Sequence, residues 1–292
     1  MRTRVDRLRD WAIGIWAVLA LVYLFIPIFI VALFSFNDNK GRFNFTWQGF
    51  TWRHWQHPFA VEGLQSALEK SLLIGLLATL IALILGTGIA LAAVRYRFRG
   101  RSVVEQLIFL PLATPEVVMG AALLGLFLTA NFARGFVTIL IAHVMFTLGY
   151  VVVTIRARLE GMDLHIEEAA MDLGANEWTT IRKVTLPLIA PGLAAAGLLA
   201  YAISIDDFVI TNFNAGQTTT FPLFVYGAAR QGVPPEVNVL ATALLLIVLV
   251  LMVANVLLQK RLARRDRGVE MPQTGDAPPV VVAGAPGAPA AG

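Results

Sequence analysis

Six stretches of the chain are long and almost free of charge, and polar segments separate them. A helix needs about 20 mostly apolar residues to span the hydrocarbon core of a bilayer, and each stretch reaches that length. Because backbone groups in lipid must be satisfied within the segment, the pattern predicts helices rather than strands. We therefore expect an all-α integral membrane protein with six transmembrane helices, at residues 11–36, 71–94, 104–130, 136–155, 187–210 and 237–259.

The composition agrees with this pattern and narrows the class of protein. Of the 292 residues, 57% are hydrophobic and only 14% are charged, whereas soluble domains carry about 25% charged residues. The chain has no cysteine, which excludes disulfides and cysteine-ligated metals. The first apolar stretch is too long for a cleaved signal peptide, and no small-residue cleavage site follows it.

The basic residues fall unevenly on the two sides that six spans define. Seventeen of the 23 Lys and Arg residues lie on the side of the N-terminus. The positive-inside rule then predicts that both termini are cytoplasmic. The net charge of +4 therefore reflects topology, and we expect no nucleic-acid partner. Residues 1–10 are expected to form a cytoplasmic N-terminal tail, and residues 263–292, rich in Pro, Ala and Gly, a disordered cytoplasmic tail.

The first external loop, from about residue 38 to 69, is dense in aromatic side chains. Trp and Phe in such a place are typical of an interfacial belt or a short surface helix, which is the interpretation we favour. His54 and His57 stand three residues apart, as two metal ligands on a helix would. No third ligand lies nearby in the sequence, so we expect no metal site.

Motifs for enzymatic chemistry are absent from the sequence. It contains no G-x-x-x-x-G-K-[ST] phosphate loop, no H-E-x-x-H zinc motif and no G-x-S-x-G nucleophile elbow. We therefore expect that this chain is not an enzyme, binds no cofactor and does not itself hydrolyse ATP.

Three acids in or near the apolar spans are the candidates for a substrate pathway. A charge near the bilayer centre costs at least about 2.5–3.5 kcal/mol, so it normally faces a cavity or a partner. Glu116 lies in the third span, and Asp206 and Asp207 lie near the outer end of the fifth, where adjacent side chains point about 100° apart. Tyr201 and Phe208 could stack on a cation beside them. The alternatives are a buried structural carboxyl for the first acid, a solvated pair at a helix end for the other two, and core packing for the aromatic residues.

Prolines favour bent helices in two of the spans. Pro111 and Pro115 lie in the third span, and Pro187 and Pro191 begin the fifth. Bent helices at bilayer depth usually line a cavity, although a simple packing kink is an equal alternative. His143, within the fourth span, is interpreted as a hydrogen-bonding residue between helices rather than a proton carrier.

The loop between the fourth and fifth spans, residues 156–186, is the longest polar passage on the expected cytoplasmic side. Connections between helices usually take 2–8 residues, so this one has structure of its own. The run from Glu167 to Leu173 lacks Gly, Pro and β-branched residues, which predicts a short helix that Gly174 ends. Asn176 can cap a second helix with Glu177 in its first turn. We interpret the loop as a docking surface for another protein; a loop packed only on its own membrane domain is the alternative.

The residue spacing in this loop resembles the EAA loop of ABC-transporter permeases. Their pattern, E-A-A-x3-G-x9-I-x-L-P, runs here from Glu168 to Pro187, with Val184 in place of Ile. Five further segments are similar to the PotC/PotI type of spermidine/putrescine permease, and the similarity covers residues 10–262. They are Ser35–Asn37, Trp47–Phe50, Pro115–Gly120, Ser204–Val209 and Val233–Asn238.

The resemblance implies the permease subunit of a type I ABC importer that moves polyamine across the bacterial inner membrane by alternating access. Spans two to six would form its core, and span one would wrap the partner permease. The implied partners are a second, PotB-like permease, a dimer of PotA-like ATPase subunits that bind ATP and Mg²⁺, and an external substrate-binding protein. The residues implied in coupling to the ATPase are Glu167, Glu168, Ala169, Ala170, Asp172, Gly174, Leu186 and Pro187.

Two other functions stay open at this point. Permeases for other small cationic or polar solutes share parts of the same segments. A channel or secondary carrier that needs no ATPase is an alternative of a different class, and a co-purifying ATPase would distinguish it.

Overall fold

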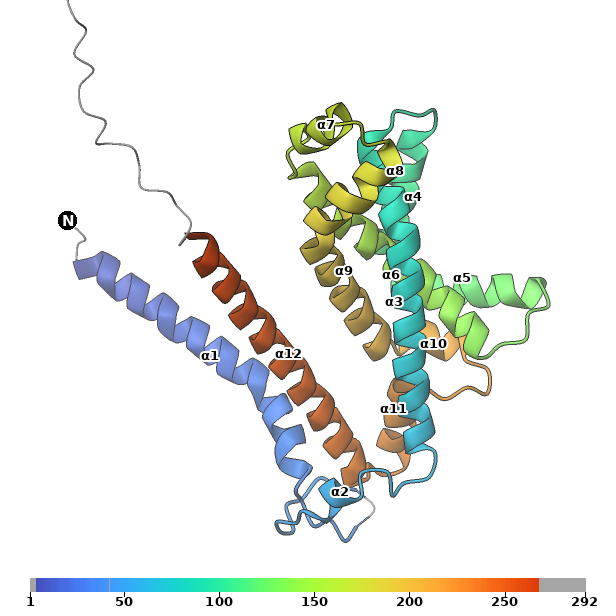
Figure 1. Ribbon diagram of the computed structural model, residues 1–292. Helices are drawn as coiled ribbons and strands as arrows, with labels where there is room; N and C mark the ends of the chain where they lie inside the picture. Colours follow the sequence, from blue (N-terminus) through green and yellow to red (C-terminus); the bar gives the residue numbers. More distant parts are fainter. Residues whose placement is uncertain (1–3, 42, 268–292) are drawn as a thin grey trace, which may run out of the picture. The chain divides into compact units, whose positions relative to one another are not determined.

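The computed structural model describes residues 4–41 and 43–267, and this part of the chain is almost entirely helical (Figure 1). The only extended pairing within it is a bridge between Asn37 and Phe50, so the all-α prediction is confirmed there. The helices are α1 Arg4–Phe34, α2 Arg53–Gln56, α3 Leu64–Arg95, α4 Arg101–Ala113, α5 Glu116–Thr129, α6 Phe136–Glu160, α7 His165–Asp172, α8 Glu177–Thr180, the π-helix η1 Ile181–Thr185, α9 Leu186–Asp206, α10 Val209–Asn214, α11 Phe221–Gln231 and α12 Pro235–Arg267.

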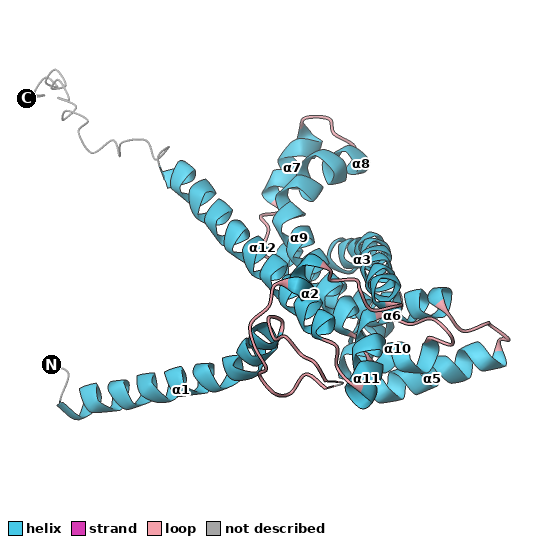
Figure 2. Ribbon diagram, turned by 90° about the horizontal axis from the view of Figure 1, so that it is seen from below, coloured by secondary structure: helices cyan, strands magenta, loops and turns pink. Residues whose placement is uncertain are grey.

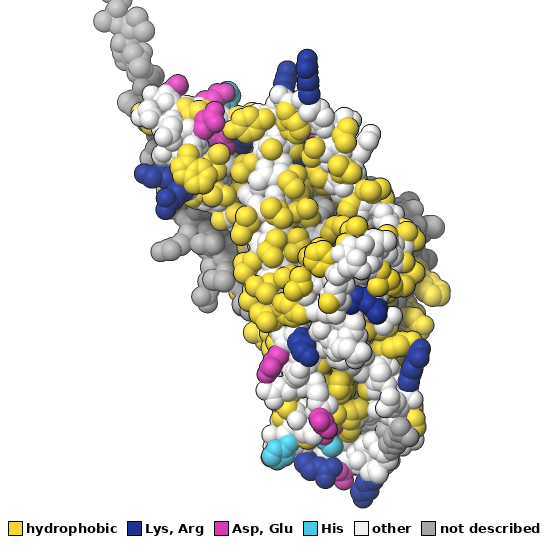
Figure 3. Space-filling model, turned by 90° about the vertical axis from the view of Figure 1, so that its right-hand side faces the viewer, with side chains coloured by type: hydrophobic (Ala, Val, Ile, Leu, Met, Phe, Trp, Pro, Cys, Tyr) yellow, Lys and Arg dark blue, Asp and Glu magenta, His cyan; other side chains and the backbone are white. Residues whose placement is uncertain are grey.

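Within the described residues, four segments are long and apolar enough to cross a membrane. They are Trp11–Phe34 of α1, α3, α6 and the continuous run Glu177–Asp206 that ends with α9. The bent pair α4 and α5 makes a fifth if it counts as one span, and α12 contributes a shorter apolar helix, Pro235–Val250. Figure 3 shows hydrophobic side chains over the middle of one face and most charged side chains toward its two ends. Five of the predicted spans thus correspond to such segments, and the count of six stays a prediction.

The third predicted span, residues 104–130, is not one continuous helix. α4 and α5 meet at an angle of 111°, because Pro115 has no N–H to extend the helix and keeps the residue before it out of the helical region. Thr114 is accordingly extended, with φ −84° and ψ 129°. Pro111, in contrast, lies inside α4 without ending it.

The fifth predicted span, residues 187–210, ends earlier than expected. α9 stops at Asp206, and Asp207 is extended, with φ −64° and ψ 118°, before the chain turns into the short helix α10. Pro191 lies inside α9 without breaking it, and Pro187 stands in its first turn. Asp206 and Asp207 therefore lie at a corner between α9 and α10.

The core of the first compact unit, residues 1–241, is a bundle of α3, α6 and α9 (Figure 1). Its buried centre contains mainly Ala, Val, Ile and Leu side chains, including Ala82, Val151 and Ala200. Small residues let the helices approach closely: a Cβ on Gly86 of α3 would stand only 2.6 Å from Val151 Cγ1 of α6. α5 and α10 pack together beside α6 (Figure 2).

Helices extend into both of the predicted tails. α1 begins at Arg4, within the predicted N-terminal tail, and the side chains of residues 11–31 are exposed. α12 passes from the first compact unit into the second, residues 242–292, and continues to Arg267. Residues 263–267 of the predicted disordered tail are therefore helical, and residues 268–292 lie outside the described part of the chain.

The loop between α1 and α3 holds the predicted aromatic cluster and the short helix α2. The Phe36 ring stacks on Phe50 and Trp55, with centroid distances of 5.6 and 5.3 Å. His54 is buried, and its Nδ1 lies 2.9 Å from Glu236 Oε1 at the start of α12. This contact holds α2 against Glu236, which stands 182 residues after His54 in the sequence.

Candidate functional site

The loop between α6 and α9 folds as its sequence predicts. α7 ends at Asp172, and Gly174 follows with φ +90°, a left-handed conformation that favours glycine. Asn176 Oδ1 then accepts a hydrogen bond of 2.8 Å from the backbone N–H of Thr179 and so caps α8. The two short helices and the glycine between them are confirmed.

Glu167 ties this loop to the membrane helices. Its Oε1 accepts hydrogen bonds from Arg95 Nη2 at 2.8 Å and from Thr185 Oγ1 at 2.7 Å. Arg95 is the last residue of α3, and Thr185 ends the π-helix η1. Beside this contact, the Tyr96 hydroxyl donates to Glu177 at 3.1 Å, which raises the pKa of Tyr96. Of the eight residues predicted to couple to an ATPase, Glu167 is thus the buried one that faces its own chain.

The other predicted coupling residues are less buried than Glu167, and they lie in the loop and in the first turn of α9. Five of them are exposed, and Ala170 and Leu186 are half-buried; the exposed ones are Glu168, Ala169, Asp172, Gly174 and Pro187. Two large apolar side chains stand among them, Leu173 at 90% exposure and Trp178 at 69%. Large apolar side chains that stand exposed on a polar loop are typical of a surface that another protein covers.

One exposed ionisable pair lies in the same loop. His165 Nδ1 is 2.9 Å from Glu168 Oε2, and this hydrogen bond is the main cause that raises the pKa of His165 above 6.5; the charge of Asp163 adds to it. Both side chains of the pair are exposed, so a partner protein can reach them.

The structure separates the three candidate pathway acids. Glu116 is the first residue of α5 and is exposed, and a carboxylate is favourable at a helix N-terminus. Asp206 is also exposed, at the end of α9, whereas Asp207 is only 7% exposed. The two adjacent acids therefore differ in exposure, but not as neighbours on one helix, because Asp207 lies beyond the end of α9 in an extended conformation. The solvated-pair alternative does not hold for Asp207.

Asp207 is satisfied inside the protein. Its Oδ2 accepts hydrogen bonds from the N–H of Thr211 at 2.8 Å and from Thr211 Oγ1 at 2.7 Å, and its Oδ1 accepts from the N–H of Ile210 at 3.2 Å. These contacts cap the start of α10. His143 Nε2 of α6 lies 3.3 Å from the same Oδ2. The carboxylates of Glu116 and Asp206 are therefore exposed at the surface of the chain, whereas that of Asp207 is buried.

His143 joins three helices, which confirms the predicted hydrogen-bonding role. Its Nδ1 lies 2.7 Å from Ser204 Oγ of α9, and its Nε2 lies 2.8 Å from Thr211 Oγ1 of α10. Sequence reasoning did not identify these two hydroxyl residues, because they stand 61 and 68 residues away along the chain.

The two candidate aromatic residues have different surroundings. Tyr201 is half-buried, and its ring lies against Gly75 of α3, where a Cβ would be 3.2 Å from the ring; it packs between helices. The Phe208 ring packs against Tyr226 of α11 in a tilted arrangement, with a centroid distance of 4.4 Å and an interplanar angle of 39°, and the Arg230 guanidinium lies 4.5 Å from the centroid of the Tyr226 ring. Tyr226 thus already holds a cation on its face. The sequence analysis did not identify this pair, although residues four apart lie on one face of a helix and the spacing of Tyr226 and Arg230 favours such a contact.

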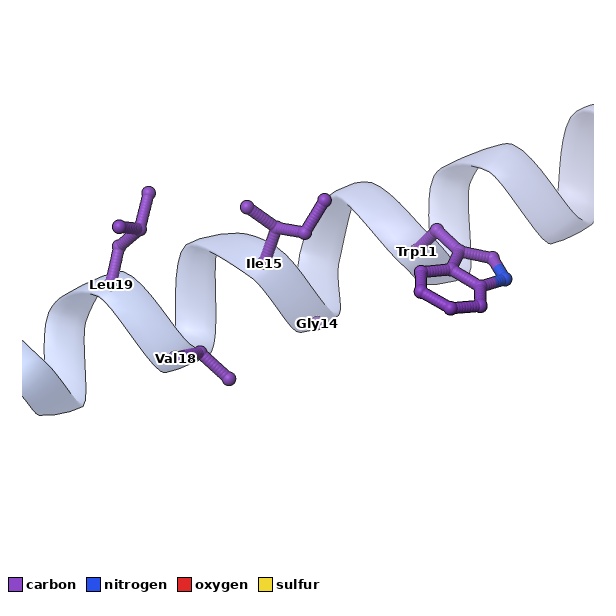
Figure 4. Close-up of a pocket in the computed structure, with 5 residues that line it drawn as sticks. All are labelled: Trp11, Gly14, Ile15, Val18 and Leu19. Atoms are coloured by element: carbon purple, nitrogen blue, oxygen red, sulfur yellow. The ribbon is translucent and has the colours of Figure 1, made fainter.

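The remaining surface features carry no catalytic arrangement in the described part of the chain. No group of three or more His, Asp or Glu side chains there could hold a metal ion. A shallow depression on α1 is lined by Trp11, Gly14, Ile15, Val18 and Leu19, all from one helix (Figure 4). It lacks the enclosing walls and convergent polar groups of a small-molecule site.

Comparisons with known proteins agree with this architecture. The family model described as "Binding-protein-dependent transport system inner membrane component" matches residues 79–268. The chain is 40% identical over 240 residues to the spermidine/putrescine transport system permease protein PotC of Haemophilus influenzae, which covers 82% of this chain and 93% of that protein. It is 40% identical over 243 residues to the putrescine transport system permease protein PotI of Escherichia coli K12, which covers 80% and 85%.

A solved structure supports the fold. A chain of a bacterial ABC transporter involved in the import of the acidic polysaccharide alginate superposes with a TM-score of 0.64, at 18% identity, over 89% of this chain and 98% of that one. Together with the apolar helices, these matches identify a multi-pass protein of the inner membrane. The chain belongs to the inner-membrane components of binding-protein-dependent transport systems, and within them to the PotC/PotI type of ABC importer permease.

Proposed function

We propose that this chain moves polyamine, spermidine or putrescine, across the inner membrane as one permease subunit of an ATP-driven importer. The observation that carries the proposal is the 40% identity to PotC over 93% of that protein's length. The exposed carboxylates of Glu116 and Asp206 support it, because a polycation needs negative groups along its path. Transport requires that such groups bind the cargo transiently, since tight binding would trap it.

The proposed topology has six spans with both termini in the cytoplasm. It rests on the excess of Lys and Arg on that side of the sequence. The loop between α6 and α9 is then cytoplasmic, and the corner at Asp206 lies toward the outer side.

The proposed assembly contains a second, PotB-like permease, two PotA-like ATPase subunits and an external substrate-binding protein. The exposed apolar side chains of the loop, Leu173 and Trp178, belong to the surface that contacts an ATPase subunit. ATP and Mg²⁺ bind to that subunit, and no cofactor binds to this chain. Closure of the ATPase dimer moves the loop, and the contact between Glu167 and Arg95 carries the movement to α3.

The experiment that tests the substrate is stimulation of ATP hydrolysis by the complete complex in lipid nanodiscs. We expect the binding protein loaded with spermidine or putrescine to raise the rate, and a neutral sugar or an acidic amino acid to leave it unchanged. Stimulation by a non-amine solute alone would assign another substrate. In proteoliposomes, substrate uptake that needs no ATPase subunit would assign the chain to the channels or secondary carriers.

A further inference from the structure

We propose that His143 is a positioning residue of the substrate path: it holds Asp207 at the corner between α9 and α10, so that of these two adjacent acids only Asp206 faces the cargo. The role of Asp206 rests on the proposed function. The role of His143 in shaping the corner rests on the hydrogen bonds of this chain.

The hydrogen bonds at the corner fix where the histidine carries a proton. The Thr211 hydroxyl donates its only hydrogen to Asp207 Oδ2 at 2.7 Å. Its oxygen can therefore only accept from His143 Nε2, which lies 2.8 Å away. Nε2 thus bears a hydrogen in both the neutral and the protonated imidazole, and it points at Thr211 and Asp207 Oδ2. Ser204 Oγ, at 2.7 Å, completes the contact on the Nδ1 side.

Burial makes this contact necessary. The side chains of His143 and Asp207 are only 3% and 2% exposed, and a buried carboxylate is costly unless every lone pair finds a donor. Ile210 and Thr211 supply three donors from α10 itself. His143 supplies the contact from another helix, α6, and so fixes the corner relative to the bundle.

The corner determines which acid is presented. Asp207 leaves the helical conformation and turns inward, and the residue before it remains as the exposed end of α9. If the anchor on Asp207 is lost, α9 and α10 can join differently, and the direction of Asp206 changes with them. His143 therefore acts on the cargo only through these two acids.

Two amide variants separate the contacts of the imidazole. The amide nitrogen of His143→Gln can reach the place of Nε2 and donate to Thr211, whereas that of His143→Asn reaches only the place of Nδ1, next to Ser204. Both keep a polar side chain in the site, so a difference between them reports the contact with Thr211 and Asp207 rather than the loss of the ring.

The chain has no cysteine, so a single introduced thiol reports the direction of residue 206. In the assembled complex, we would measure the labelling rate of Asp206→Cys with a membrane-impermeant maleimide. The control is Phe45→Cys, an exposed position in the loop between α1 and α3. We expect His143→Asn to change the labelling rate of Asp206→Cys by about tenfold, because this is the effect of losing one hydrogen bond to a charged group. We expect His143→Gln to leave the labelling rate unchanged. The control rate should stay the same in both.

Equal labelling of position 206 in the wild-type, Asn and Gln backgrounds would overturn the proposal. So would an equal change in both variants, because the contact with Thr211 would then not matter. With Asp206 intact, His143→Asn should lower spermidine uptake, and Asp206→Asn should lower it no further in the double variant. If the wild-type complex transports no polyamine, the proposed function fails, but the labelling result still decides the role of His143.

Discussion

The contact between Arg95 and Glu167 should determine how much transport each ATP supports. It joins the end of α3 to the helix α7, which is proposed to meet the ATPase. The variant Arg95→Met removes the charge and keeps the length of the side chain. We expect it to hydrolyse ATP with little loss but to transport less substrate per ATP, because α7 can then move without α3.

The structure gives the size of the effect. The two side chains are 17% and 12% exposed, with 2.8 Å between Nη2 and Oε1. Removing one partner of a fully buried pair costs about 3–5 kcal/mol, and an exposed pair contributes about 0–1 kcal/mol. For this mostly buried pair we expect about 2–3 kcal/mol, which corresponds to a factor of about 30–150 in the equilibrium between held and released α7.

The assay is the ratio of labelled spermidine taken up to ATP hydrolysed, in proteoliposomes that contain the complete complex. The matched control is Arg101→Met, which breaks a more exposed pair with Glu105 at 3.2 Å and should leave the ratio near the wild-type value. The double variant Arg95→Met, Glu167→Gln should recover part of the ratio, because it leaves no unpaired buried charge. A wild-type ratio in Arg95→Met, or the same loss in Arg101→Met, would show that the contact between Arg95 and Glu167 does not couple ATP hydrolysis to transport.

Three further predictions follow from the loop and from the pathway acids. Gly174→Val should reduce coupled transport, because a β-branched residue at φ +90° is strained by at least about 1–2 kcal/mol, while Gly174→Asn should retain most of it; equal loss in both would exclude backbone strain as the cause. Leu173→Cys, placed in this cysteine-free chain, should cross-link to the ATPase subunit with a short bismaleimide, and Phe45→Cys should not; the reverse result would contradict the proposed topology. Glu116→Gln and Asp206→Asn should each slow spermidine uptake without loss of subunit assembly, and unchanged uptake kinetics in both would remove them from the path.

Local sequence signals predicted the parts of the protein that depend on neighbouring residues. The two helices of the coupling loop could be predicted because a glycine at a C-cap and an asparagine at an N-cap act within a few residues, as Gly174 and Asn176 do. The apolar spans were predictable for a similar reason, since the bilayer acts on each segment separately.

Contacts between distant residues could not be predicted in this way. Pro115 signalled a bend, but the 111° angle between α4 and α5 also reflects the packing of α5 on α10. Glu167 was expected to face an ATPase subunit, and in the structure it contacts Arg95 of its own chain, which stands 72 residues earlier. The direction of Asp207 likewise depends on His143 of α6. The sequence predicted that the two adjacent acids point apart as neighbours on one helix, whereas in the structure they differ because α9 ends at Asp206 and Asp207 turns inward.

Whether this chain imports polyamine at the expense of ATP can be measured directly as accumulation of labelled spermidine in proteoliposomes that contain the chain and its three kinds of partner subunit. We predict accumulation against a concentration gradient that requires ATP and the binding protein, and that falls strongly when Glu116 and Asp206 are both neutralised. Accumulation of spermidine without ATP would exclude an ATP-driven importer, and import of another solute but never of spermidine would exclude polyamine as the substrate.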